Sequence, residues 1–454
     1  MLLTIVAFIV ALGLLIAVHE YGHYRVAVAC GVKVLRFSVG FGRPLLRWQH
    51  KGSPTEFVIG AFPLGGYVRM LDEREAPVAP AERHLAFNTQ PLRARAAIVA
   101  AGPVANLLLA ILLYATVNWS GVDEPKALLA SPVAGSIAQQ AGLHGGELVL
   151  GAALGEQEFE PVRSFEDLRW TLTRGALDGE NVRLQFQPVH GTLQRELVLP
   201  LDQMEVREAD AQLFRKIGIV GPWTRPVLGE LVAGGAAERA GLRRGDLVLR
   251  VGASEVVDGS QLRELIRASV GPGAAQAQAW RIERDGRELE LAVQPDVVQE
   301  AGGPVGRIGA FVGAAPEMVN VSYGAVEGLW KGAERTWEVS VLTLRMMARM
   351  VVGEASIKNL SGPLTIADYA GRSASMGLTQ YLAFLALISV SLGVLNLLPL
   401  PVLDGGHLMY YLWEGLTGRS VSEAWMERLQ RGGVVVLLLM MSIALFNDLT
   451  RLFG

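Results

Sequence analysis

The residues best suited to chemistry form the run His19-Glu20-Tyr21-Gly22-His23, which follows the first apolar stretch of the chain. Histidines four residues apart lie on one face of a helix, so both imidazoles can bind one zinc ion. Glu20 lies beside them without having to bind the metal, so its carboxylate can take a proton from water as a general base. A chance match to H-E-x-x-H in a chain of this length is on the order of one in a hundred. The run therefore predicts a zinc site with a catalytic carboxylate.

The remaining zinc ligand is expected to be a histidine or a carboxylate, since Cys30 is the single cysteine of the chain. The best candidate is Asp404, in the run Asn396–His407 (NLLPLPVLDGGH) that ends a later apolar stretch. If both stretches cross a membrane in the same direction, His19 and Asp404 lie at a similar depth. Two histidines and one carboxylate leave one of the four positions on zinc open, as a catalytic site requires. Two alternatives remain: Asp404 belongs to a plain helix-ending turn, or His407 is the ligand.

The composition indicates a membrane protein. Apolar residues make up 51% and charged residues 19% of the 454 residues, which is too apolar for an ordinary soluble enzyme. Four uncharged stretches are candidate membrane spans: Met1–Val18, Ala96–Trp119, Ser373–Leu403 and Gly432–Asn447, the last being near the lower length limit. The first stretch has no basic residue before it and no small-residue cleavage site after it, so it is not expected to be removed as a signal peptide.

Basic residues set the expected orientation. Lysines and arginines are frequent between the first two spans, and the positive-inside rule places that loop in the cytoplasm. Both termini and the long segment after Trp119 are then expected outside, with the zinc site toward the cytoplasmic side. The net charge of −3 gives no reason to expect nucleic acid as a partner.

The long segment after Trp119 contains a repeat. The ten residues Ala141–Leu150 (AGLHGGELVL) recur as Ala240–Leu249 (AGLRRGDLVL), with seven identities at an offset of 99. A period of this length indicates two copies of one small domain. The shared motif resembles that of PDZ domains, which bind extended peptide ends by strand addition. Lys216–Ile219 is a candidate loop for a terminal carboxylate, and the alternative is two β-rich spacers that bind nothing.

Two further segments are expected beside the membrane. Glu56–Met70 (EFVIGAFPLGGYVRM) has two short apolar runs around Phe62–Gly66, which predicts a β-hairpin with a glycine-rich turn. It could pair with an extended substrate, or be a surface hairpin with no such role. Apolar residues from Val326 to Ala348 recur every three or four positions, which predicts an amphipathic helix. The helix either lies on the outer membrane face, gates the site, or packs beneath the repeated domains.

The pairing of H-E-x-x-H with a later N-x-x-P-x-P-x-x-D-G resembles the site-2 protease family of intramembrane zinc proteases. The extended matches are His19–Gly31, Gly102–Asn106 (GPVAN) and Asn396–Gly406. Members of the family often have a second asparagine five residues before Asn396, where this chain has Ser391.

The resemblance implies which residues do which task. It implies Zn²⁺ held by His19, His23 and Asp404, with Glu20 as the general base. It also implies a re-entrant β element beside the site, and an Asn396 side chain that hydrogen-bonds the substrate backbone.

The expected fold is a multi-pass α-helical membrane protein with four transmembrane helices, a membrane-associated β-hairpin and two tandem β-rich PDZ-like domains. Residues 1–119 contain the first two spans, and 122–222 and 223–300 contain the PDZ-like domains. Residues 320–372 contain the amphipathic helix and a linker, and 373–454 contain the last two spans.

Together these features predict a zinc metalloendopeptidase that cleaves the transmembrane segment of single-span proteins. The resemblance implies an anti-sigma factor as a substrate after a first external cut, remnant signal peptides as further substrates, and a place in the bacterial inner membrane. The PDZ-like pair would bind or screen peptide ends from outside. The alternative is a membrane-anchored PDZ scaffold that binds peptides and holds zinc structurally, in a closed site that includes His407.

Overall fold

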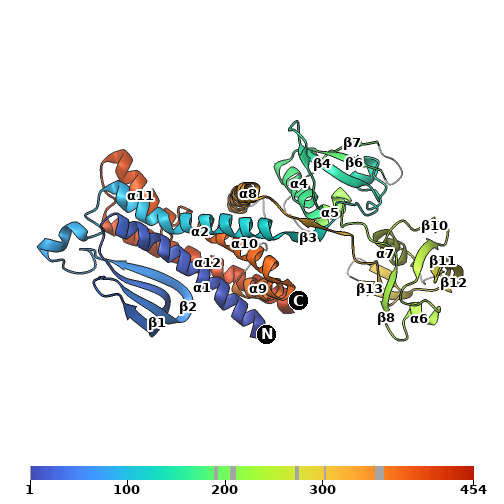
Figure 1. Cartoon of the computed structure of the whole chain (residues 1–454), viewed down its shortest axis with the longest axis horizontal. Helices are drawn as coiled ribbons and strands as arrows, with labels where there is room; N and C mark the ends of the chain where they lie inside the picture. The colour runs from blue at the N-terminus through green and yellow to red at the C-terminus, as the bar shows by residue number, and fades with distance from the viewer. Residues whose placement is uncertain are drawn as a thin grey trace. The chain divides into compact units, whose positions relative to one another are not determined.

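The structure is a computed structural model that describes residues 2–188, 193–204, 211–270, 276–300, 303–352 and 362–453 (Figure 1). The chain divides into two compact units. The membrane unit comprises Met1–Gly121 and Ser322–Gly454, and the inserted unit comprises Val122–Val321.

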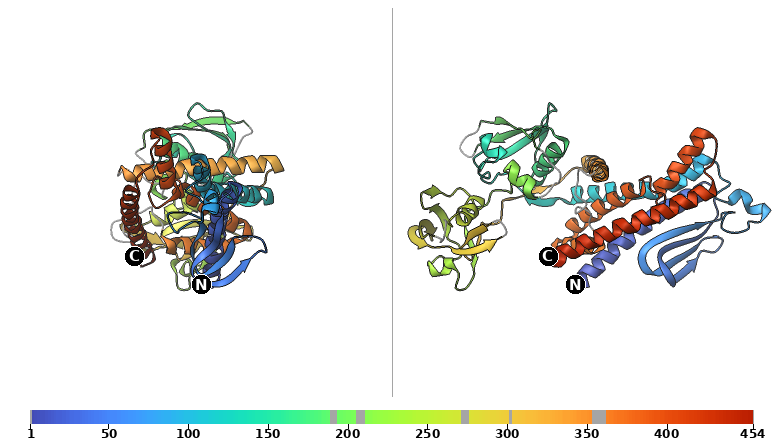
Figure 2. Two further views of the ribbon diagram at one scale, coloured as in Figure 1. Left: turned by 90° about the vertical axis from the view of Figure 1, so that its left-hand side faces the viewer. Right: turned by 180° about the vertical axis from the view of Figure 1, so that it is seen from behind.

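Within the described residues, four helices of the membrane unit are long and apolar enough to cross a membrane. They are α1 (Leu2–Ala29), α2 (Leu92–Ser120), α10 (Leu378–Asn396) and α12 (Glu423–Phe453). The number of candidate spans is the number expected from the sequence, and the chain is a membrane protein. Both ends of the chain lie at the same end of this unit (Figure 2).

The extents of the spans differ from the sequence expectation. α1 continues past Val18 to Ala29, so the H-E-x-x-H motif lies inside one continuous helix. The expected third span, Ser373–Leu403, is wrong at both ends, because α10 begins after Gly377 and ends at Asn396. Gly377 has φ +127°, a conformation that interrupts a helix and favours glycine. The fourth span is longer than expected, since α12 contains the whole of Gly432–Asn447.

Two shorter helices flank α10. α9 (Pro363–Met376) precedes it, and α11 (Asp404–Thr417) follows it after a turn that contains Pro399 and Pro401. Proline has no N–H group with which to continue a helix, so the two prolines help to separate α11 from the span. Asp404 is therefore the first residue of a new helix rather than the last residue of the third span.

Small residues let the membrane helices approach closely. Gly22 of α1 faces α2 so tightly that a Cβ atom there would lie 2.3 Å from the carbonyl oxygen of Ala101. Ala7 and Ala11 of α1 are buried in one cluster with apolar side chains of α2, α9 and α10. Such close packing replaces the hydrophobic effect as the cohesive force between helices inside lipid.

α8 (Ala325–Val351) is the amphipathic helix that the apolar spacing predicts. It packs on α2, where a Cβ atom at Gly332 would lie 2.7 Å from the carbonyl oxygen of Ile111. Trp330 and Trp337 are each 71% exposed, so the helix also presents a large apolar surface.

A sheet built from β1 (Val34–Gln49) and β2 (Glu56–Met70) lies along α1 (Figures 1 and 2). The expected hairpin within Glu56–Met70 is wrong in its pairing, because residues 36–39 pair with both 56–59 and 66–69. The first half of β1 therefore lies between the two runs that were expected to pair with each other. Glycines and a proline interrupt the strand pattern of β1, which hides it in the sequence. A short 3₁₀ helix, η1 (Pro80–Leu85), lies between the sheet and α2 in sequence.

The inserted unit contains two four-stranded antiparallel sheets with the same arrangement. Their strand orders are β5-β4-β6-β7 and β10-β9-β11-β12. The first half consists of α3 (Ile137–Gln140), β4 (Leu148–Leu154), β5 (Glu160–Pro161), α4 (Phe165–Asp178), β6 (Val182–Gln187), β7 (Arg195–Leu199) and α5 (Ala211–Ile217). The second half contains α6 (Ala236–Arg239), β9 (Leu247–Val251), β10 (Ser254–Glu255), α7 (Gly259–Arg267), β11 (Gln278–Arg284) and β12 (Arg287–Val293). The two copies of the sequence repeat form equivalent parts, since each ends in the central strand β4 or β9.

Two-stranded ribbons complete the inserted unit. They pair β3 (Val122–Pro125) with β16 (Met318–Val321), β8 (Leu228–Leu231) with β15 (Ala310–Val312), and β13 (Asp296–Glu300) with β14 (Gly303–Arg307). Because β15 pairs with β8, the second half extends past residue 300, the boundary expected from the sequence. The fully buried Asp258 accepts hydrogen bonds from the backbone N–H and the hydroxyl of Ser131, which links the two halves.

Candidate metal centre

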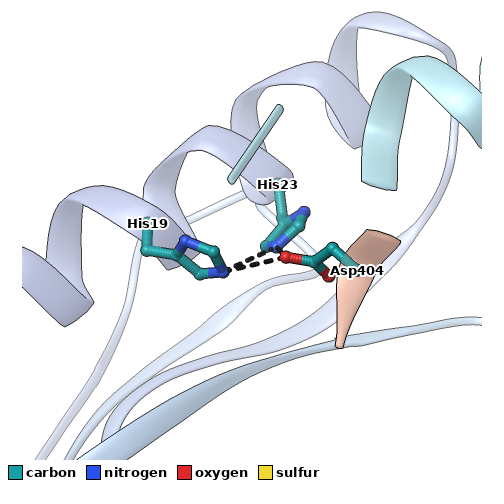
Figure 3. Close-up of side chains that lie close together, drawn as sticks. All are labelled: His19, His23 and Asp404. Carbon is teal, nitrogen blue, oxygen red and sulfur yellow. Dashed lines mark hydrogen bonds and ion pairs between the residues drawn. The ribbon is translucent and has the colours of Figure 1, made fainter. Parts of the chain in front are cut away.

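α1 places the two histidines of the motif on one face. The Nε2 atoms of His19 and His23 lie 3.2 Å apart, and the two rings meet at 83°. Their side chains are 12% and 11% exposed. The two imidazoles point toward one place, as residues one helical turn apart can (Figure 3).

α11 brings Asp404 to the same place from a distant part of the sequence. Its Oδ2 atom lies 3.2 Å from Nε2 of His19 and 3.5 Å from Nε2 of His23 (Figure 3). Across the described part of the chain, these three residues form the one group of three potential metal-ligating side chains whose ligand atoms lie within 4.8 Å of one another. The structure thus brings together the three ligands expected from the sequence.

The spacing of these atoms fits a tetrahedral zinc ion. Zinc bonds nitrogen and oxygen at about 2.0–2.2 Å, so neighbouring ligand atoms of a tetrahedron lie roughly 3.3–3.6 Å apart. The observed separations of 3.2, 3.2 and 3.5 Å are close to this range. Oδ2 of Asp404 is also buried without a hydrogen bond from any described group, although both imidazoles are near. A buried carboxylate oxygen without a hydrogen bond is destabilising unless another group, such as a cation, binds it.

The charge of Asp404 also suits a divalent cation. Burial raises the pKa of this carboxyl group, but the two neighbouring imidazoles outweigh the effect of burial and hold the pKa at about 2. Asp404 is therefore an anionic oxygen donor at neutral pH.

α2 contacts both imidazoles. His23 Nδ1 lies 2.8 Å from the carbonyl oxygen of Ile98. A carbonyl can only accept, so the neutral ring carries its proton on Nδ1 and leaves Nε2 available to bind a metal. Gly102 gives the His23 ring its space, and the fully buried Asn106 places Nδ2 3.2 Å from His19 Nδ1.

Two contacts hold α11 in position, one near each end of the helix. Arg95 of α2 donates to both carboxylate oxygens of Glu414, at 2.6 and 3.3 Å. A Cβ atom at Gly405 would lie 2.2 Å from the carbonyl oxygen of Leu398, so α11 packs directly on the preceding turn. These contacts fix the helix whose first residue is Asp404.

Glu20 follows His19 on α1, and its side chain lies against the sheet. A Cβ atom at Gly66 of β2 would lie 2.8 Å from Cγ of Glu20, so the backbone of β2 passes close to this side chain at Gly66. Glu20 does not belong to the cluster of potential ligands found within the described residues.

The other residues singled out by the sequence lie on α10 and α11. Asn396 is the last residue of α10, and its Nδ2 donates to the carbonyl oxygen of Leu392 at 2.9 Å. Ser391 donates to the carbonyl oxygen of its own helix four residues earlier. His407, one turn after Asp404, packs edge-on against the ring of Tyr410, outside the cluster of three. Burial lowers the pKa of His407, which keeps this imidazole neutral.

Comparison with known proteins identifies the family. The family described as Peptidase family M50 matches residues 7–440, nearly the whole chain. The chain belongs to peptidase family M50. A relative of this M50 protease in Ralstonia nicotianae, named as a zinc metalloprotease, is 43% identical over 100% of this chain and 99% of its own length. The regulator of sigma-E protease RseP of Escherichia coli and the regulator of sigma E protease of Salmonella typhi are each 38% identical over 98% of both chains. The M50 protease is therefore a metalloprotease, and its cofactor is zinc.

Sequence reasoning missed the part of α2 that supports the site of this M50 protease. It marked Gly102–Asn106 as a family motif but assigned no role to Gly102 or Asn106. A signal was available, because Ile98, Gly102 and Asn106 are spaced four apart and so share one face of α2.

Proposed function

We propose that this M50 protease holds its zinc ion with His19, His23 and Asp404 and hydrolyses peptide bonds inside the membrane-spanning segments of its substrates. The observation that carries the proposal is the convergence of three ligand atoms from α1 and α11 at tetrahedral spacing. Three protein ligands leave one position for water or substrate. Zinc bound there would polarise the scissile carbonyl and lower the pKa of the attacking water.

Glu20 is the proposed general base. It adjoins His19 on α1 and is available for proton transfer because it is not one of the ligands. Its carboxylate takes a proton from the attacking water and then delivers a proton to the leaving amine.

The sheet is the proposed platform for the substrate. A helical substrate must unwind before cleavage, because its carbonyl groups are bonded within the helix. Residues 66–70 pair with 34–39 on one side, and an extended peptide added to their other side would lie beside Glu20. Asn396 would give up the hydrogen bond that its Nδ2 donates to the carbonyl oxygen of Leu392 and would hydrogen-bond the backbone of that peptide instead.

The proposed substrates are single-span proteins, including an anti-sigma factor after a first external cut, and remnant signal peptides. The names of two relatives, regulators of sigma-E, support an anti-sigma factor. The protease would lie in the bacterial inner membrane, with both termini and the inserted unit outside and the zinc ligands toward the cytoplasm. The many basic residues between α1 and α2 support this orientation.

The two halves of the inserted unit are proposed to be PDZ-like domains that bind or screen peptide ends. Their common strand order supports two copies of one fold. Lys216–Ile219, at the end of α5, is the proposed loop for a terminal carboxylate.

The alternative function, a peptide-binding scaffold with a structural zinc ion, would be favoured by a closed site with four protein ligands. His407, the candidate for the fourth ligand, lies outside the cluster formed by the described residues. Membership of a peptidase family also favours the enzyme.

The proposed roles predict different effects for two substitutions. Glu20→Gln is expected to abolish cleavage of a single-span substrate, because the amide cannot accept the proton, while bound zinc stays near one ion per chain. Asp404→Asn is expected to lower bound zinc as well, because a neutral amide replaces an anionic ligand. Bound zinc and cleavage product are measured on the purified full-length chain in detergent.

Tyr21→Phe is the matched control within the motif. Tyr21 is 51% exposed and does not belong to the cluster of potential ligands among the described residues, so zinc and cleavage should both be retained. Cleavage by Glu20→Gln would refute the assigned base, and full zinc content in Asp404→Asn would refute the assigned ligand.

A further inference from the structure

Asn106 has a polar side chain deep inside an apolar membrane helix. It is fully buried, and the residues that follow it in α2 (LLLAILL) are all apolar. A buried amide in such surroundings is destabilising unless it makes hydrogen bonds. Its Nδ2 lies 3.2 Å from Nδ1 of His19, whereas its Oδ1 is buried without a hydrogen-bond partner in the described part of the chain. The amide is therefore directed at the ring of a proposed zinc ligand.

The location of the ring proton on His19 decides which end of the amide can bind it. When Nε2 gives its lone pair to a metal, the proton of the neutral imidazole must be on Nδ1. An Nδ1–H group cannot face the amide NH₂ group, because both are donors. A half-turn of the amide brings Oδ1 to the same position at little steric cost, because the two ends of an amide are similar in size. That turn also gives the unpartnered Oδ1 a donor.

Nδ1 of His23 also faces a polar group of α2, but in this case the group is a backbone carbonyl. The carbonyl oxygen of Ile98, 2.8 Å from His23 Nδ1, can only accept a hydrogen bond. His19 instead faces a group that can either donate or accept. The backbone thus determines the tautomer of His23, and a side chain must determine that of His19.

We propose that Asn106 is a positioning residue for zinc: its Oδ1 accepts a hydrogen bond from Nδ1–H of His19 and so directs Nε2 to the ion. The inference rests on the proposed role of His19 as a ligand. One face of α2 then supports both imidazoles, through Ile98 and Asn106. Loss of such an outer partner typically weakens metal binding about 10–100-fold.

The test is the zinc affinity of the purified full-length chain in detergent, measured by competition with a chromophoric chelator. Leucine matches asparagine in size but accepts no hydrogen bond, so Asn106→Leu is expected to weaken zinc binding about 10–100-fold. A carboxylate accepts strongly from Nδ1–H, so Asn106→Asp is expected to bind zinc at least as tightly as wild type.

Ser389→Ala is the matched control. Ser389 is fully buried, and its hydroxyl donates to the backbone carbonyl oxygen of Asn106 at 2.7 Å. Its removal deletes a hydrogen bond to the same residue without changing the amide, so zinc affinity should stay near wild type.

Wild-type affinity in Asn106→Leu would overturn the inference. So would an affinity of Asn106→Asp as low as that of Asn106→Leu, because a packing role predicts that a buried charge is the more damaging change. If the leucine variant does not fold, the aspartate variant still decides the question, because zinc affinity well below wild type in Asn106→Asp would overturn the inference. A wrong assignment of the metal site itself would give a different result. In that case wild type would bind no zinc, or His19→Ala would bind zinc as tightly as wild type.

Discussion

A single glycine gives one proposed zinc ligand its space. A Cβ atom at Gly102 would lie 2.3 Å from Nε2 of His23, far closer than atoms in contact can lie. The ring is held in place by the bond from its Nδ1 to Ile98. Gly102→Ala is therefore expected to weaken zinc binding at least about tenfold in a chelator competition. Gly13→Ala, where a new Cβ atom meets nothing within 4 Å, should leave affinity unchanged, and equal affinities for the two variants would contradict the explanation.

The residues proposed to bind zinc could be predicted from the sequence. The residues proposed to position those ligands could not. The proposed roles of His19 and His23 follow from their spacing on one helix, and that of Asp404 from its place after a span. Gly102 matters only because the His23 ring lies over it. The spacing of Ile98, Gly102 and Asn106 places them on one face of α2, but it does not show that His19 of α1 lies beside the Asn106 amide.

One buried carboxylate joins two helices of the membrane unit. Asp448 of α12 is fully buried and accepts hydrogen bonds from the N–H groups of Gly362, Leu364 and Thr365, where α9 begins. These groups have no acceptor within their own helix. Asp448→Ala is expected to lower the free energy of unfolding by at least about 2 kcal/mol, measured as a lower Tm in detergent. Asp368→Asn, at a half-exposed ion pair of α9, should shift Tm little; equal Tm losses would argue against this role for Asp448.

Helices of the membrane unit were easier to predict than its sheet. Apolar runs of about 20 residues identify spans directly, although Gly377 and the turn before Asp404 shorten the third one in ways that average hydropathy does not show. The order of the sheet was missed, because residues 36–39 pair with two segments at once and such pairing depends on contacts between distant residues.

At the scale of the whole chain, the membrane unit is expected to fold without the inserted unit. Its two segments meet at the point of insertion, where Tyr323 N–H donates to Asn118 O and Trp119 Nε1–H donates to Ala325 O. Replacement of residues 122–321 by a short glycine–serine linker should therefore keep zinc content near wild type. If the inserted unit screens substrates, the shortened protein should also cleave an untrimmed single-span substrate faster than wild type. Loss of zinc would show that the membrane unit depends on the insert.

The position of Asp404 at the start of α11 has a consequence for how the protein is made. His19 and His23 leave the ribosome early, while Asp404 belongs to the last tenth or so of the chain. If these three residues are the ligands, a nascent chain that has inserted only its early helices into the bilayer lacks one ligand and cannot yet bind zinc. Protease activity then appears only when synthesis is nearly finished. Unfinished or truncated copies therefore cannot cleave the other proteins of the membrane.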